Sequence, residues 1–351
     1  RMQIPIRHSV TPRTAARLML FACVVLFAAL RLRWVGHLLS WDEAYNLCTV
    51  RTFVSGGTDF ATNWFWRHPP LFCLMMALLK PLSTGFAERV ELLAIAVGIL
   101  NLLLLYRLNR HVFTRPVALW SAFFLAVMPA AMFFDVWVKR DHPVAAFGLL
   151  AVLCLLKRRT LYSALCLGVA LLFKETAVFY VAAVFLLWGL GAAGRRRPRD
   201  LVVLLVIPAL TSGWWYLVVQ SKVAAIDAGA GGAPLSWDRL IPALTEHLRF
   251  ARGAQSEWRR GGFYYFTLLP HFLGIAGLAT AAAGLTALVA RACRRPPDTV
   301  AGRDGRISAA AFWPVALLFP ALALLSLLPA KVPWVPMTLS PAWSTLQAVG
   351  I

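Results

Sequence analysis

Long apolar stretches separated by short polar turns recur along almost the whole chain. Many run for roughly 18 to 20 residues, the length that an α-helix needs to cross the hydrocarbon core of a bilayer. We therefore predict an all-α, polytopic membrane protein with about ten transmembrane helices. The expected spans are residues 17–34, 89–107, 116–134, 143–156, 161–173, 176–193, 201–219, 264–290, 308–328 and 335–351.

The turns between these spans differ in charge. Alternate turns hold 19 of the 35 Lys and Arg residues but 3 of the 15 Asp and Glu residues: the N-terminus to Arg17, and residues 107–115, 157–159, 195–200 and 291–306. Basic turns stay on the cytoplasmic side of a membrane. The remaining turns, with a first loop at 35–88 and a second at 220–262, are therefore predicted to lie on the extracytoplasmic side.

The apolar segment 69–82 has about 14 residues, which is short for a span and typical of a re-entrant or interfacial helix. Counting it as a span would reverse every later loop, against the charge pattern. We therefore expect interfacial helices in the first loop of a single transmembrane domain, 1–351. Because the chain starts without Met and stops at Ile351 in an apolar stretch, we also expect trimmed ends, with the C-terminus truncated.

Composition narrows the function classes. Hydrophobic residues make up 60% of the chain and charged residues 14%, so each acid beside a span requires an explanation. The net charge of +20 is divided among short juxtamembrane turns, which favours anionic lipid over nucleic acid as the partner. The six cysteines lack metal-ligand spacing, and Cys48 and Cys73 alone could share an external loop as a disulfide.

Acids and bases are concentrated on the predicted external face. Transfer of a group from an anionic lipid carrier needs cations that neutralise the leaving phosphate and a carboxylate that deprotonates the acceptor hydroxyl. The candidate residues are Asp42, Glu43, Tyr45, His68, Arg89, Arg140, Asp141, Lys174 and Lys331.

An ordered set of motifs carries a family resemblance. It consists of Asp42-Glu43 with Tyr45, His68-Pro69-Pro70-Leu71, Arg140-Asp141, Phe173-Lys174-Glu175 and Lys331-Val332-Pro333. From about Leu18 to the C-terminus, the set resembles the GT-C glycosyltransferases that use lipid-linked sugars, the group of protein O-mannosyltransferases and lipid A aminoarabinose transferases. Trp334 stands where relatives often carry Tyr, and these 351 residues are fewer than many relatives have.

The resemblance implies an inverting transfer from a polyprenyl-phosphate sugar, with Asp42 as general base. Glu43 would support Asp42, hold the acceptor, or join Asp141 in binding a divalent cation. His68, Arg89, Arg140, Lys174, Lys331 and Tyr45 would contact the donor phosphate or the substrate.

Each of these residues also has a structural interpretation. Asp42 could be a helix N-cap, and His68 could mark a helix entry before two prolines. Asp141 is predicted to be a second catalytic acid of the site, with Asp135 as its less favoured competitor, although an acid at a helix N-terminus is stabilised whatever its function. Lysines and arginines at span ends could simply reach toward headgroups, and Arg140 could pair with Asp141.

The leading hypothesis is a hexosyl- or pentosyltransferase of the cell membrane that acts on the extracytoplasmic face. Its acceptor is a lipid, a glycan or a protein. Two alternatives remain: a transporter, whose charges should lie near the bilayer midplane, and a non-catalytic membrane subunit of the same fold. The sequence names neither the sugar nor the acceptor.

Overall fold

The computed structural model is a bundle of α-helices. It describes residues 11–36, 47–51, 69–79, 85–136, 139–194, 196–219, 264–293, 309–327 and 338–351. Within these ranges it contains no β-strand. The prediction of an all-α fold is confirmed.

The helices differ widely in length. In chain order they are α1 (Pro12–Leu32), α3 (Leu71–Ala77), α4 (Phe86–Val112), α5 (Arg115–Val127), α6 (Pro129–Phe134), α7 (Asp141–Leu156), α8 (Thr160–Phe173), the 3-10 helix η3 (Glu175–Ala177), α9 (Val178–Gly189), α10 (Pro198–Trp214), the π-helix η4 (Trp215–Val219), α13 (Tyr264–Leu273), α14 (Ile275–Cys293), α16 (Trp313–Leu327) and α17 (Ser340–Val349).

Three of the described helices are long and apolar enough to cross a membrane: α1, α4, and α10 continued to Leu217. Five further apolar helices have 10–17 residues, among them α7 and α8. The chain is therefore a helical membrane protein, while the number of about ten spans stays a prediction. With seven residues, α3 is too short to cross a bilayer.

The expected span 264–290 is bent in the structure. The segments Thr267–Leu273 and Ile275–Arg291 meet at an angle of 105°. Gly274 joins them with a φ of +74°, a backbone conformation that favours glycine. The expected span 116–134 is also divided, because Pro129 cannot donate the backbone hydrogen bond that would continue α5 into α6.

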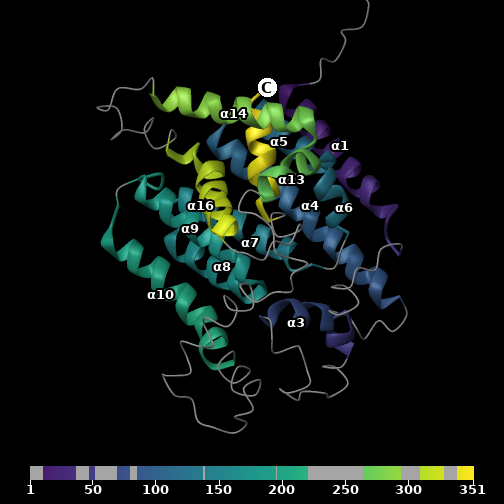
Figure 1. Ribbon diagram of the computed structural model, residues 1–351, viewed down its shortest axis with the longest axis vertical. Coiled ribbons are helices and arrows are strands. Elements are labelled where there is room, and N and C mark those ends of the chain that lie inside the picture. Colours follow the sequence, from purple (N-terminus) through teal and green to yellow (C-terminus); the bar gives the residue numbers. More distant parts are fainter. Residues whose placement is uncertain are drawn as a thin grey trace, which may run out of the picture.

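The long helices form the body of the bundle (Figure 1). Helix α8 packs between α7 and α10, and α5 contacts α1, α4 and α17. Helix α14 packs on α17 and lies crosswise at the end of the bundle where the chain terminates (Figure 1). Helix α3 lies toward the opposite end (Figure 1).

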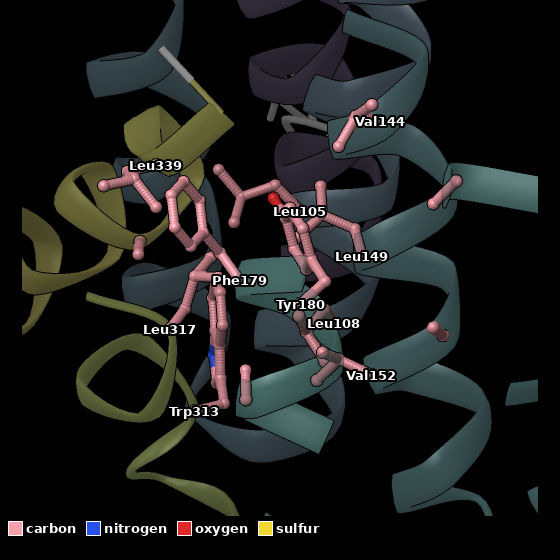
Figure 2. Close-up of a cluster of buried hydrophobic side chains, with 14 of the residues drawn as sticks. Leu105, Leu108, Val144, Leu149, Val152, Phe179, Tyr180, Trp313, Leu317 and Leu339 are labelled. Carbon is pink, nitrogen blue, oxygen red and sulfur yellow. The ribbon is translucent and has the colours of Figure 1, made fainter. Parts of the chain in front are cut away.

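The core joins α4, α7, α9 and α16 (Figure 2). Tyr180 of α9 is fully buried and donates a hydrogen bond to the carbonyl oxygen of Thr338, at 2.9 Å. Its ring lies directly on the backbone of α7 at Gly148, where a Cβ atom would overlap the ring carbons. Glycine at this position therefore sets how closely α7 and α9 approach.

Candidate active site at the α6–α7 junction

A buried cluster of charged residues surrounds the start of α7. Asp135 follows α6, Arg140 precedes α7, and Asp141 and His142 are the first two residues of α7. All four are buried. Because α7 is apolar beyond this turn, the charges are concentrated at one end of the helix.

Asp135 pairs with an arginine from within the first helix. Arg31 of α1 is 0% exposed, and its Nε and Nη2 atoms donate to Oδ2 of Asp135 at 2.8 and 2.6 Å. The guanidinium carbon lies 3.5 Å from the centre of the Phe27 ring. Gly98 of α4 makes room for this ring, since a Cβ there would approach it to 2.6 Å.

Asp141 forms an ion pair with Lys174, which follows α8, through both of its carboxylate oxygens. The Nζ atom of Lys174 donates to Oδ1 and Oδ2 of Asp141 at 3.0 and 2.8 Å. The Asp141 side chain is 1% exposed and that of Lys174 19%. Lysine has three N–H donors, so the pair leaves one donor of a partly accessible ammonium group for a ligand.

Helix α3 packs against the same junction. The guanidinium carbon of Arg140 lies 5.9 Å from the centre of the Phe72 ring. Burial raises the pKa of the Cys73 thiol, and the neighbouring Arg140 offsets part of this rise through its charge and a hydrogen bond. Cys73 is therefore a protonated, buried group, and it is a free thiol in the structure.

Helix α4 contributes polar contacts from two of its turns. Glu91 accepts a hydrogen bond from the backbone N–H of Gly36 at 2.7 Å, which ties the end of the α1 segment to α4. Asn101 donates through Nδ2 to the backbone carbonyl of His142 at 3.0 Å. Arg89 lies in the first turn of α4, at the same end of the bundle.

The structure brings together only part of the predicted site. Arg140, Asp141 and Lys174 are neighbours, and Arg89 shares their end of the bundle. Five predicted residues lie outside the described ranges: Asp42, Glu43, Tyr45, His68 and Lys331.

Sequence reasoning missed the roles of Arg31, Asn101 and His142 in this cluster. Arg31 carried a usable signal, since a charged residue inside an apolar span is costly and normally paired within the protein. The partner of Arg31 could not be read from the sequence, because 104 residues separate it from Asp135.

A divalent cation at Asp141 does not fit the described residues. Both carboxylate oxygens already accept from the Lys174 ammonium group, whose positive charge would repel a metal ion. Among the residues that the structure describes, no group of three or more His, Cys, Asp or Glu side chains could hold a metal.

Comparisons with known proteins agree with this architecture. A family model for dolichyl-phosphate-mannose-protein mannosyltransferase matches residues 67–219, a range that contains Arg140, Asp141 and Lys174. The structure of ArnT from Cupriavidus metallidurans bound to undecaprenyl phosphate superposes with a TM-score of 0.65 at 16% identity, over 97% of this chain and 60% of that one. The chain has the GT-C fold.

Other GT-C structures extend the comparison. ArnT in its apo state gives a TM-score of 0.64 at 17% identity, over 96% of this chain and 59% of ArnT. The apo oligosaccharyltransferase of Archaeoglobus fulgidus gives 0.63 at 13% identity, over 96% of this chain and 50% of the enzyme. This chain thus spans about half to three fifths of the length of these GT-C proteins. No curated protein gives a sequence match.

Proposed function

We propose that this chain is an integral-membrane glycosyltransferase that transfers a sugar from a polyprenyl-phosphate donor to an acceptor on the extracytoplasmic side. The observation that carries the proposal is the superposition on ArnT bound to undecaprenyl phosphate. The match of residues 67–219 to a mannosyltransferase family supports it, as does the ion pair of Asp141 with Lys174 at one end of the bundle.

In the proposed reaction, an acceptor hydroxyl oxygen attacks the anomeric carbon of the donor sugar. The bond from that carbon to the phosphate oxygen breaks, and polyprenyl phosphate leaves with the bonding electrons. A single direct displacement inverts the anomeric configuration. Asp42 takes the hydroxyl proton as general base, and Glu43 supports Asp42 or holds the acceptor.

Cations stabilise the charge that develops on the departing phosphate. We assign this task to Lys174, because Asp141 holds two of its N–H groups and the third is left for a phosphate oxygen. Arg89, Arg140 and Lys331 are the other proposed phosphate contacts, and His68 and Tyr45 line the substrate site. Asp141 thereby acts as the group that holds Lys174 in place.

The placement of the site on the extracytoplasmic face is supported by the direction of the helices. Asp141 begins α7, whereas Lys157 and Arg158 follow its other end. Lys174 follows the end of α8, whose first residue comes directly after Arg159. Since basic turns face the cytoplasm, the Asp141–Lys174 pair lies at the external end of both helices.

The proposal predicts that Asp42→Asn abolishes transfer without removing the protein from the membrane. General bases contribute about 100-fold or more to rate, so transfer should fall by at least that factor. Labelled sugars on a panel of polyprenyl-phosphate donors, with the product mass recorded, measure this and identify the sugar.

Asp200→Asn is the matched control, because Asp200 is an acid in the first turn of α10, at the end of the basic turn 195–200. This variant should transfer at the wild-type rate. Wild-type activity in Asp42→Asn would contradict the assignment of the base. If the wild type binds the donors but transfers no sugar from any of them, the proposed transfer reaction is contradicted.

A further inference from the structure

The side chain of Arg31 is fully engaged. A guanidinium group has five N–H donors, and five hydrogen bonds leave that of Arg31: two to Asp135, and one each to the carbonyl oxygens of Phe27, Leu125 and Ala126. These contacts fix the guanidinium between α1 and the end of α5. Asp135 is therefore held in one position and its charge is neutralised.

Asp135 in turn reaches the first turn of α7. Its Oδ1 atom lies 3.5 Å from Nδ1 of His142, the residue directly after Asp141. The backbone carbonyl of His142 accepts from Asn101 of α4. The turn that carries Asp141 is thus held from α1 through Asp135 and from α4 through Asn101.

Packing alone does not hold this turn. A small cavity of about 20 Å³ borders it and is lined by Asp135, Asp141, His142, Asn101 and Ser340 together with apolar residues. Asn101 is 6% exposed, and its Oδ1 atom has no hydrogen-bond partner among the described residues. A space of this size admits about one water molecule. The turn therefore has room to shift if its polar contacts are lost.

We propose that Arg31, Asp135 and His142 are positioning residues, a buried anchor that sets the place of Asp141 and, through Asp141, of Lys174. Asp135 thus acts through His142 and is not a second acid of the reaction. The kinetic part of this inference rests on the proposed transfer reaction. The structural part, the fixed first turn of α7, does not.

Hydrogen–deuterium exchange tests the structural part without any activity. In the Asp135→Asn variant, the amide groups of residues 144–148 should exchange faster than in the wild type, while those of residues 149–156 further along α7 remain unchanged. Equal exchange at residues 144–148 in the variant and the wild type would overturn the proposal, whether or not the chain transfers sugar.

Kinetics test the functional part. Displacement of a reacting group by about 1 Å can cost about 100-fold in rate, so Asp135→Asn and His142→Leu should each lose about 100-fold in kcat. The KM for the polyprenyl-phosphate donor should stay near the wild-type value in His142→Leu, because Arg89 and Arg140 keep their charges. Unchanged kcat in both variants would overturn the proposal.

A conservative change separates positioning from general damage. The Nδ2 atom of asparagine can occupy the place of the histidine Nδ1 atom and donate to Asp135. His142→Asn should therefore recover most of the kcat that His142→Leu loses, and its residues 144–148 should exchange as in the wild type. Equal losses in the two variants would contradict the role of the Asp135–His142 contact.

A double variant separates positioning from stability. Replacing both members of a buried ion pair by apolar residues of similar size often restores stability that a single replacement removes. Arg31→Met with Asp135→Leu should thus unfold at a higher temperature than Arg31→Met, yet keep the low kcat, because His142 has lost its contact. If the double variant recovers kcat as well as stability, the Arg31–Asp135 pair only stabilises the fold and the positioning role is contradicted.

Asn109→Leu is the matched control for loss of a buried polar group. Asn109 lies at the other end of α4, where its Nδ2 atom donates to Ser121 and Thr345 and its Oδ1 atom accepts from Trp313. This variant should unfold at a lower temperature, while its kcat and the exchange at residues 144–148 stay at wild-type values. If Asn109→Leu loses as much kcat as Asp135→Asn, the effect of Asp135→Asn comes from general loss of stability and the positioning role is contradicted.

Discussion

At the scale of single residues, two ion pairs at the start of α7 have different environments. Arg31 with Asp135 is enclosed by the bundle, whereas Lys174 with Asp141 has an ammonium group that solvent or a ligand can reach. Such pairs contribute little to stability when compared with apolar packing, but breaking one by removing a single partner leaves a buried charge. A ligand can therefore reach the Lys174–Asp141 pair but not the Arg31–Asp135 pair. Replacing one member of either pair by an apolar residue should destabilise the protein.

Lys174→Met should lower the free energy of unfolding by about 3 kcal/mol, because it leaves the buried Asp141 carboxylate without its cation. Thermal unfolding of the purified protein in detergent measures the change. Lys174→Met combined with Asp141→Leu should recover most of the loss, since no charge is left unpaired. If the single variant unfolds like the wild type, the pair does not form in the membrane protein.

The residue types and their order in the sequence were enough to predict some members of this cluster, but not which residues pair with each other. Arg140, Asp141 and Lys174 were readable because charges beside apolar spans are scarce. The choice of Lys174 as the partner of Asp141 depends on how α7 packs on α8, and the arginine that neutralises Asp135 comes from α1. Contacts across such distances in the chain follow from tertiary packing, which periodicity does not encode.

At the scale of elements, the apolar stretches predicted where helices occur better than where they break. The expected spans at 89–107 and 161–173 correspond to α4 and α8. The bend between α13 and α14 was missed, because Gly274 lies inside a continuous apolar stretch and a single glycine does not force a break. Hydropathy measures the environment of a segment, and the same environment accommodates a straight or a bent helix.

Close contact between α7 and α9 depends on Gly148. Gly148→Ala should lower the free energy of unfolding by about 1–3 kcal/mol, because the added methyl group meets the Tyr180 ring in a well-packed core. Gly189→Ala in α9 is the control, since nothing lies within 4 Å of a Cβ there. In detergent, the unfolding temperature of the control should equal or exceed that of the wild type, because alanine favours helix more than glycine does. The reverse order of the two variants would contradict the packing.

At the scale of the whole molecule, the Asp141–Lys174 pair and the basic turns lie at opposite ends of the same helices. Arg110 is in the last turn of α4, Arg115 begins α5, and Lys157 follows the end of α7 that lies away from Asp141. This polarity was predictable from charge counts alone, because the positive-inside rule depends on composition and not on packing. The GT-C comparison adds the fold but no orientation.

The predicted orientation can be measured by cysteine labelling. In a background with Cys48→Ser and Cys293→Ser, Glu88→Cys at the exposed start of α4 should react with a membrane-impermeant maleimide in intact cells. Lys157→Cys, at the exposed end of α7, should react only after the membrane is permeabilised. The opposite pattern would show that the Asp141–Lys174 pair faces the cytoplasm.

The pair of Arg31 with Asp135 also bears on how the chain is built into the membrane. Arg31 is synthesised 104 residues before its partner, and until that partner has emerged, this arginine in the last turn of an apolar helix has no counter-charge, which is unfavourable in a membrane. We expect α1 to remain beside the translocon until α5 and α6 have emerged. The order of helix assembly would then depend on Arg31, which enters the membrane early and is neutralised only when Asp135 follows.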